Sequence, residues 1–291
     1  MDDALVTTRP ILINGAKQGT RRHTTARRIT RLRAGWLELV EGAVAWRIWH
    51  VIGIGDLRRR YARSRMGQLW LTLSSGISIA IIGVMWALLW KIPVSEMLPF
   101  LAASMVIWQL VSGIISDATT AFSTSAHYLL SQRIACASVI FALIYRNLLV
   151  FFHNVPIVAV VFLVFGHPLS LHALLILPAL ALTVISAVWW SYVVATFCVR
   201  FRDLVHAVQS LLQLAFYVTP VIWKPEFLPE HVRWLQMLNP FAIYIGILRD
   251  PLLGEPLAPT YWLVAVGIAF GGLALSLPFI GRYRRRLLYW V

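Results

Sequence analysis

The stretch LTLSSGISIAIIGVMWALLW, residues 71–90, runs for 20 positions without a charged side chain. An α-helix rises about 1.5 Å per residue, so a stretch of this length covers the roughly 30 Å hydrocarbon core of a bilayer. The whole chain is 59% hydrophobic and 13% charged, whereas about a quarter of the residues in a soluble domain are charged. The sequence therefore predicts a membrane-spanning helix here.

Similar apolar runs follow along the chain. They cover residues 98–115, 139–165, 174–199, 204–223 and 261–280. Only the run 139–165 is clearly marked by polar groups, which are Arg146, His153 and Asn154. We therefore expect an all-α integral membrane protein, with six transmembrane helices in one domain over residues 71–281.

The basic residues predict the orientation of this bundle. More than half of the 26 Lys and Arg precede residue 70, and Arg133, Arg200 and Arg202 fall in loops on the same side. The last run is followed by a basic C-terminus, residues 282–291. By the positive-inside rule, both ends are expected in the cytoplasm of a multi-pass protein of the inner membrane. The net charge of +14 alone could suggest a nucleic-acid-binding protein, but the arginines cluster at the chain ends and between the apolar runs, so we expect no binding of nucleic acid.

Two segments are neither spans nor simple loops. Residues 36–60 are apolar but contain charged side chains, which favours an interfacial amphipathic helix on the cytoplasmic leaflet, within a basic entrance region 36–70. Residues 224–259 hold apolar stretches of about a dozen residues, a length that suits short re-entrant helices on the outer side. The prolines that divide them are Pro225, Pro229, Pro240, Pro251, Pro256 and Pro259.

The N-terminal residues 1–35 are polar and rich in Arg and Thr, with no apolar core of a signal peptide. We expect a disordered basic cytoplasmic tail, or alternatively a basic arm that touches anionic lipid headgroups. The two cysteines, Cys136 and Cys198, are far apart and in no metal-ligand spacing, so both are expected to be reduced near the cytoplasmic face.

The sequence lacks the motifs that would indicate a catalytic or metal-binding site. None of the lysines, Lys17, Lys91 and Lys224, lies in a phosphate loop. No His/Cys cluster indicates a metal site, and no pair of carboxylates inside a span indicates a proton relay. We therefore expect no catalytic residue, metal or cofactor in this chain, and an energy source on a partner.

Three stretches carry a resemblance to a known family. DLRRRYARSRMGQLW, residues 56–70, resembles the segment before the first span of type 2 ATP-binding-cassette permeases. FRDL, residues 201–204, is similar to the fourth-to-fifth loop of that family. TPVIW at 219–223, followed by LPE, RWL and LNP up to residue 240, resembles its outer segment. Within the family, the sequence is most similar to exporters of O-antigen and teichoic-acid polysaccharides.

The resemblance implies a homodimer of this chain with two copies of a separate nucleotide-binding ATPase subunit, which holds the ATP and Mg. It also implies a lipid-pyrophosphate-linked polysaccharide as cargo, moved from the cytoplasmic to the outer side, with membrane lipids around the complex. Alternatives are a type 2 permease for a drug or small lipid, and a scaffold for other membrane proteins. A membrane-embedded glycosyl or phosphoryl transferase would need clustered carboxylates or histidines.

Candidate residues for the substrate entrance are basic or aromatic and precede the first span. They are Arg58, Arg59, Arg60, Tyr61, Arg63 and Arg65. An arginine fork suits the oxygens of a pyrophosphate. The alternative is that these residues serve only to anchor the chain end in the cytoplasm.

The third apolar run contains polar residues that are candidates for the pathway or the dimer, namely Arg146, Asn147, His153 and Asn154. Arg146 and His153 are seven residues apart and so share a helix face. Snorkelling or pairing between helices is the alternative for this pair.

Two further groups follow from the resemblance. The loop 121–137 is expected to be a coupling helix that docks on the ATPase through His127, Tyr128, Gln132 and Arg133, together with Arg202 and Asp203. An outer gate is expected at Pro220, Trp223, Trp234, Asn239 and Pro240. Most of the Trp, Tyr and Phe side chains are expected in interfacial belts, and a few could line a channel for sugar rings.

Overall fold

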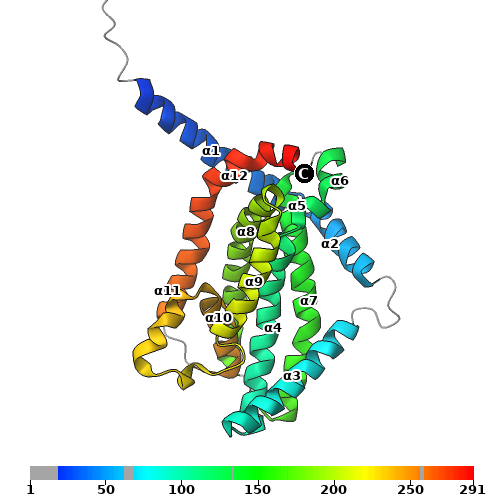
Figure 1. The fold of residues 1–291 in the computed structure, drawn as a ribbon, viewed down its shortest axis with the longest axis vertical. Helices are drawn as coiled ribbons and strands as arrows, with labels where there is room; N and C mark the ends of the chain where they lie inside the picture. Colours follow the sequence, from blue (N-terminus) through cyan, green and yellow to red (C-terminus); the bar gives the residue numbers. More distant parts are fainter. Residues whose placement is uncertain (1–18, 62–68, 133, 169, 256–258) are drawn as a thin grey trace, which may run out of the picture.

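The computed structural model describes residues 19–61, 69–132, 134–168, 170–255 and 259–291 of the 291-residue chain. These residues form helices joined by turns and short loops, without a strand in the described ranges. The prediction of an all-α membrane protein is therefore confirmed. The long helices run side by side as one bundle (Figure 1).

The helix at the centre of the bundle is α4 (Val94–Ala118). In its most apolar stretch 78% of the residues are buried, against 22% or 28% in the other long helices. Small residues such as Ala102, Ala103 and Ser104, all fully buried, let neighbouring helices approach it closely. It packs against the helices α3 (Leu69–Trp90), α7 (Cys136–Val164), α8 (Ile176–Arg200) and α10 (Pro240–Leu253).

Five helical segments in the described ranges are long and apolar enough to cross a membrane. They are Thr72–Trp90, Val94–Ala118, Cys136–Val164, Leu171–Arg200 and Pro259–Trp290. The last consists of α11 (Pro259–Val266), the π-helical turn η4 (Gly267–Gly271) and α12 (Gly272–Trp290). By length and composition the structure thus has one span fewer than the six expected.

The expected span 204–223 forms a shorter helix, α9 (Asp203–Val218), of 16 residues. At about 1.5 Å per residue it measures about 24 Å. The helix stops because Thr219 precedes Pro220 and takes an extended conformation with ψ 139°, as residues before proline do. It nevertheless runs along the bundle beside α8 and α4 (Figure 1).

Two helices precede the bundle where one interfacial helix over 36–60 was expected. They are α1 (Gly19–Val44) and α2 (Trp46–Tyr61). Since α1 begins at Gly19, the second half of the expected disordered tail 1–35 is helical, and residues 1–18 lie outside the described ranges. The second half of α1 packs closely on α12: a Cβ on Gly35 would clash with the carbonyl oxygen of Leu277, and one on Gly281 with that of Arg31.

The two ends of the bundle differ in composition. One end, named the basic end here, holds α1, α2, the end of α12 and two short helices, α5 (Ala121–Thr124) and α6 (Ala126–Gln132) (Figure 1). The start of the described chain and the C-terminus therefore lie at the same end. The free, buried thiols Cys136 and Cys198 belong to the ends of α7 and α8 that face it.

The opposite end holds the short helices η2 (Pro225–Phe227), η3 (Glu230–Leu238) and α10, in the segment where short helices were expected. The side chain of Asn239 caps α10 by accepting from the backbone N–H groups of Phe241 and Ala242, and Pro240 occupies the first turn. Gly254, with φ 72°, ends the helix in the left-handed conformation that glycine favours.

Candidate functional site

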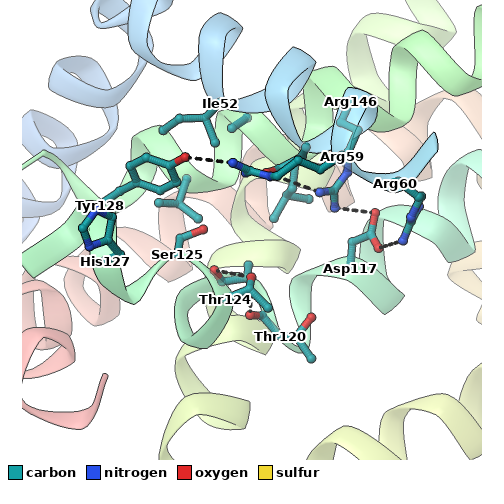
Figure 2. A pocket seen from close by; sticks show the side chains of 15 residues that line it. Ile52, Arg59, Arg60, Asp117, Thr120, Thr124, Ser125, His127, Tyr128 and Arg146 are labelled. Carbon is teal, nitrogen blue, oxygen red and sulfur yellow. Dashed lines mark hydrogen bonds and ion pairs between the residues drawn. The ribbon is translucent and has the colours of Figure 1, made fainter. Parts of the chain in front are cut away.

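A polar cavity of about 550 Å³ opens at the basic end, between α2, the end of α4, α5, α6 and α7. Figure 2 shows its charged and polar side chains turned toward one another. The cavity brings together residues that the sequence assigned to three separate roles. They are Arg59 and Arg60 of the entrance, His127 and Tyr128 of the coupling loop, and Arg146 of the third run.

Three arginines share two carboxylates in this cavity. Arg146 donates from Nη1 to Oδ2 of Asp56 at 3.0 Å, and its Nη2 lies 2.8 Å from Oδ2 of Asp117. Asp117 also pairs with Nη2 of Arg60 at 3.5 Å, and Asp56 pairs with Arg59. The cluster therefore carries one unmatched positive charge. Because the side chains of Arg146 and Asp117 are each only 16% exposed, these charges are screened less than surface charges are.

Helix packing explains how the cluster forms. Asp117 lies in the last turn of α4, Arg146 in the third turn of α7, and Asp56 in α2, and both α2 and α4 pack on α7. The amide of Asn147 donates to Asp117 at 2.8 Å and to the carbonyl oxygen of Leu143 at 2.9 Å. Asn147 thus holds the carboxylate of Asp117 toward Arg146.

A hydrogen bond joins the coupling segment to the entrance helix. Nη1 of Arg59 donates to the phenolic oxygen of Tyr128 at 3.3 Å (Figure 2). This bond and the pair with Asp56 both raise the pKa of Arg59 above its already high value, so the guanidinium stays charged. This hydrogen bond connects α6 with α2.

Other predicted entrance and coupling residues lie elsewhere. Arg58 is exposed on α2 and does not line the cavity, and Gln132 is exposed at the end of α6. Arg202 and Asp203 are exposed where α9 begins. The side chain of Tyr61, and the residues Arg63, Arg65 and Arg133, lie outside what the structure describes.

The polar residues of the third run separate into two groups. Arg146 and Asn147 belong to the cavity, whereas Asn154 is 1% exposed in the middle of the bundle. Its amide donates to Oε1 of Gln109 at 2.9 Å, and its oxygen accepts from Thr72 at 3.2 Å, which joins α3, α4 and α7. His153 is exposed, and its Nδ1 contacts the carbonyl oxygen of Leu149 in its own helix at 2.9 Å.

The residues expected to form an outer gate only partly come together. Asn239 donates to the hydroxyl of Thr219 at 2.9 Å, which brings the start of α10 beside Pro220. Trp223 donates from Nε1 to the carbonyl oxygen of Tyr217 at 3.0 Å. Trp234, in contrast, is 57% exposed on η3.

Three charged residues that form ion pairs in the structure were not among the candidates from the sequence. Asp117 follows the apolar run 98–115 directly, so a carboxylate at the end of a span was the available signal. Asp56 lies in the quoted motif but received no role. Arg249, placed in the outer segment by sequence, is 2% exposed inside α10 and pairs with Asp250 at 2.7 Å.

The described residues contain no group of three or more His, Cys, Asp or Glu that could hold a metal ion. The described residues form apolar spanning helices with a charged cavity at the basic end, which defines a multi-pass membrane protein with a polar site at one end of its bundle. Residues 49–253 match the family model of the ABC-2 type transporter, and the chain belongs to that family. The matched range runs from α2 to α10 and includes the cavity.

Curated relatives have a consistent name. The chain is 25% identical over 227 residues to the O-antigen export system permease protein RfbA of Klebsiella pneumoniae, an alignment that covers 78% of this chain and 86% of the relative. A second Klebsiella pneumoniae protein of that name is 25% identical over 201 residues, covering 69% and 78%. The Myxococcus xanthus protein of that name is 24% identical over 189 residues, covering 64% and 73%.

Proposed function

We propose that this chain is the membrane-spanning subunit of an ATP-driven exporter that moves a lipid-linked polysaccharide, similar to O-antigen, from the cytoplasmic to the outer side of the membrane. The observation that carries the proposal is the arginine-rich cavity at the basic end, which lies inside the family match. The names of the curated relatives support polysaccharide as the cargo.

The cavity suits the pyrophosphate that links a glycan to its lipid carrier. A pyrophosphate diester carries two negative charges, and Arg59, Arg60 and Arg146 offer planar forks that bind such oxygens in a bidentate manner. Asp56 and Asp117 form ion pairs with these arginines. An incoming pyrophosphate would compete with the carboxylates, so binding would be reversible and the cargo could leave.

The energy for export comes, in this proposal, from a separate nucleotide-binding subunit that holds ATP and Mg. Two copies of it would pair with a homodimer of this chain. Their docking site would be the short helices α5 and α6, with His127 and Tyr128, and the turn at Arg202 and Asp203, all at the basic end. The hydrogen bond between Tyr128 and Arg59 would carry the movement of α6 to the entrance.

This arrangement requires the basic end to lie in the cytoplasm of an inner-membrane protein, as the distribution of Lys and Arg favours. A cysteine at Gly166 or Glu255 should react with an impermeant thiol reagent from outside. A cysteine at the exposed Ser123 or at Arg284 should react only after permeabilisation. Labelling of Arg284→Cys from outside would reverse the orientation.

The function itself is tested in cells that lack this chain. Lipid-linked glycan should accumulate inside, surface glycan should disappear, and the intact chain supplied in trans should restore both. Normal surface glycan together with a changed sensitivity to drugs would favour a drug or small-lipid permease instead.

A further inference from the structure

An apolar crevice of about 520 Å³ lies between α4 and α7, on the half of the bundle away from the basic end. One residue of α8, Ile176, and one of α10, Leu252, complete its wall. The crevice shares no lining residue with the charged cavity. His167 is the one polar side chain among the lining residues that the structure describes. The crevice is therefore a separate site of opposite chemical character.

The length of the crevice matches one leaflet of a bilayer. Its lining residues on α7 share one helix face and extend from Phe151, near the middle of the helix, to Leu163, next to its end. At about 1.5 Å per residue this distance is about 18 Å. One leaflet supplies about half of the roughly 30 Å hydrocarbon core. The crevice thus runs from the middle of the membrane to the interface at the opposite end.

Neither water nor empty space suits such a crevice. A bound water needs two to four polar partners, and the apolar lining does not offer them. An empty volume of this size would leave its walls without dispersion contacts, whereas protein interiors are close-packed. Leu163 on the rim is 82% exposed, so the crevice opens sideways to the surroundings of the spanning helices. At this depth those surroundings are hydrocarbon chains.

A histidine nitrogen without a partner marks the interface end of the crevice. His167 follows the end of α7 by three residues, and its backbone N–H donates to the carbonyl oxygen of Phe162 at 2.8 Å. The two rings pack with centroids 4.8 Å apart. Nδ1 of His167 is buried and has no hydrogen-bond partner among the described residues. A buried polar atom in this state is unfavourable, so a ligand that supplies a partner would bind here.

We propose that the crevice between α4 and α7 binds one acyl chain of a phospholipid from the leaflet at the opposite end, with the ester carbonyl of that chain beside His167. An ester lies where the hydrocarbon core ends, and its oxygen accepts from Nδ1 in the tautomer that carries the proton there. Moving a chain from bilayer to crevice gains no hydrophobic energy, so close packing and this hydrogen bond retain the lipid. In the proposed orientation the lipid belongs to the outer leaflet. The inference holds for any cargo.

Photo-crosslinking of the unsubstituted chain tests whether a lipid chain enters the crevice. The full complex is placed in vesicles of phosphatidylethanolamine and phosphatidylglycerol that contain some phosphatidylcholine with a diazirine near the end of one acyl chain. Phe151 and Val158 line the crevice and are only 5% and 8% exposed, so surrounding lipid reaches them poorly. Mass spectrometry should find the crosslink on these residues. Labelling of the exposed Val160 without Phe151 or Val158 overturns the proposal.

A matched pair of variants tests retention of the lipid. Ala159 and Val160 are neighbours on α7 and both exposed, but only Ala159 lines the crevice. Native mass spectrometry of the detergent-purified complex should show one phospholipid per unsubstituted chain. Ala159→Phe, which fills the crevice, should lower retention at least tenfold, and Val160→Phe should not change it.

The contact with the ester is tested by His167→Phe, which keeps an aromatic ring but lacks Nδ1 and should lower retention several-fold. Unchanged retention in this variant overturns the role of His167. Equal retention by the Ala159→Phe and Val160→Phe variants overturns the site. Retention of a prenyl phosphate in place of a phospholipid also overturns it. So does near-complete disulfide formation between two copies of Val155→Cys, because a second protomer would then cover the crevice.

Discussion

The basic end and the opposite end of the bundle each hold a paired arginine within a helix, Arg146 in α7 and Arg249 in α10. Arg249 has a 3% exposed side chain, pairs with Asp250, donates to the carbonyl oxygen of Pro220 at 2.9 Å and lies 4.4 Å from the ring centroid of Phe100. Arg146 lies beside an open cavity, where two other arginines compete for the same carboxylates.

This difference teaches how the same residue type serves two purposes. At the opposite end each polar partner of Arg249 belongs to α10 or to a segment packed against it, so the charge is saturated and ties α10 to α4 and to the end of α9. At the basic end the cluster keeps an unmatched positive charge in contact with a cavity. A saturated arginine stabilises the fold, and an unsaturated one can bind an anion.

The largest effect is expected from removing Arg249. Arg249→Met leaves the carboxylate of Asp250 buried without its partner, which costs about 3–5 kcal/mol. We expect little folded protein in the membrane, measured by the yield of monodisperse chain in detergent. Arg146→Met should instead give a folded chain with impaired export, because its surroundings are more open. Equal loss of folded protein in both variants would remove the distinction between the two ends.

A smaller effect, a gain in anion binding, is expected when the charge of Asp117 at the basic end is removed. Asp117→Asn frees Arg60 and leaves Arg146 with Asp56 alone, so binding of inorganic pyrophosphate to the purified complex should tighten several-fold. The matched variant Asp250→Asn should lower thermal stability without any gain in binding. Weaker binding by Asp117→Asn would indicate that the aspartate positions the arginines rather than competing for them.

Loss of one hydroxyl tests the connection between α6 and α2. Tyr128→Phe removes the acceptor for Arg59, a hydrogen bond that contributes about 1 kcal/mol. Stimulation of the partner ATPase by cargo should fall a few-fold, while basal hydrolysis is unchanged. An unaltered stimulation would mean that the movement reaches the entrance by another route.

The smallest effect concerns pH. Burial raises the pKa of Glu38 in α1 above 4.5, although its Oε1 accepts from the backbone N–H of Ala137 at 3.2 Å and Arg284 lies 3.9 Å away. The folded chain therefore binds this proton more tightly than the unfolded chain does. The stabilising contribution is complete below pH 4.5 and is lost as the pH rises through the raised value. The melting temperature should thus decline slightly from acidic to neutral buffer, and Glu38→Gln should flatten that decline.

Hydropathy was sufficient to predict the five long spans of the described residues, because a bilayer imposes a length and a composition on each helix. It gave the wrong length for α9, since Thr219-Pro220 ends the helix inside an apolar run. The close contact of Gly35 with α12 is a tertiary feature without a local signal in the sequence.

The candidate site was predicted in pieces. The arginines, Tyr128 and Arg146 were each identified, but their meeting in one cavity depends on how α2, α4 and α7 are aligned. Asp117 and Arg249 were not predicted, because the ion pair of Asp117 and the burial of Arg249 depend on neighbouring helices, which the local sequence does not reveal. The roles of Arg63, Arg65 and Arg133 remain predictions from the sequence.

The central claim is that the arginines of the cavity bind the pyrophosphate of the cargo. Arg58 and Arg60 lie two residues apart on α2 and carry the same charge, but of the two only Arg60 lines the cavity. Surface glycan should therefore be measured, relative to assembled complex in the membrane, for Arg60→Gln and Arg58→Gln, each also combined with Arg63→Gln. Arg60→Lys is added because lysine keeps the charge but lacks the bidentate fork.

We expect Arg60→Gln to lower export about tenfold, Arg60→Lys to lower it in part, and Arg58→Gln to export normally, all with an unchanged amount of complex. Equal export by the Arg60→Gln and Arg58→Gln variants would contradict the account, because these arginines would then serve only to hold the basic end in the cytoplasm.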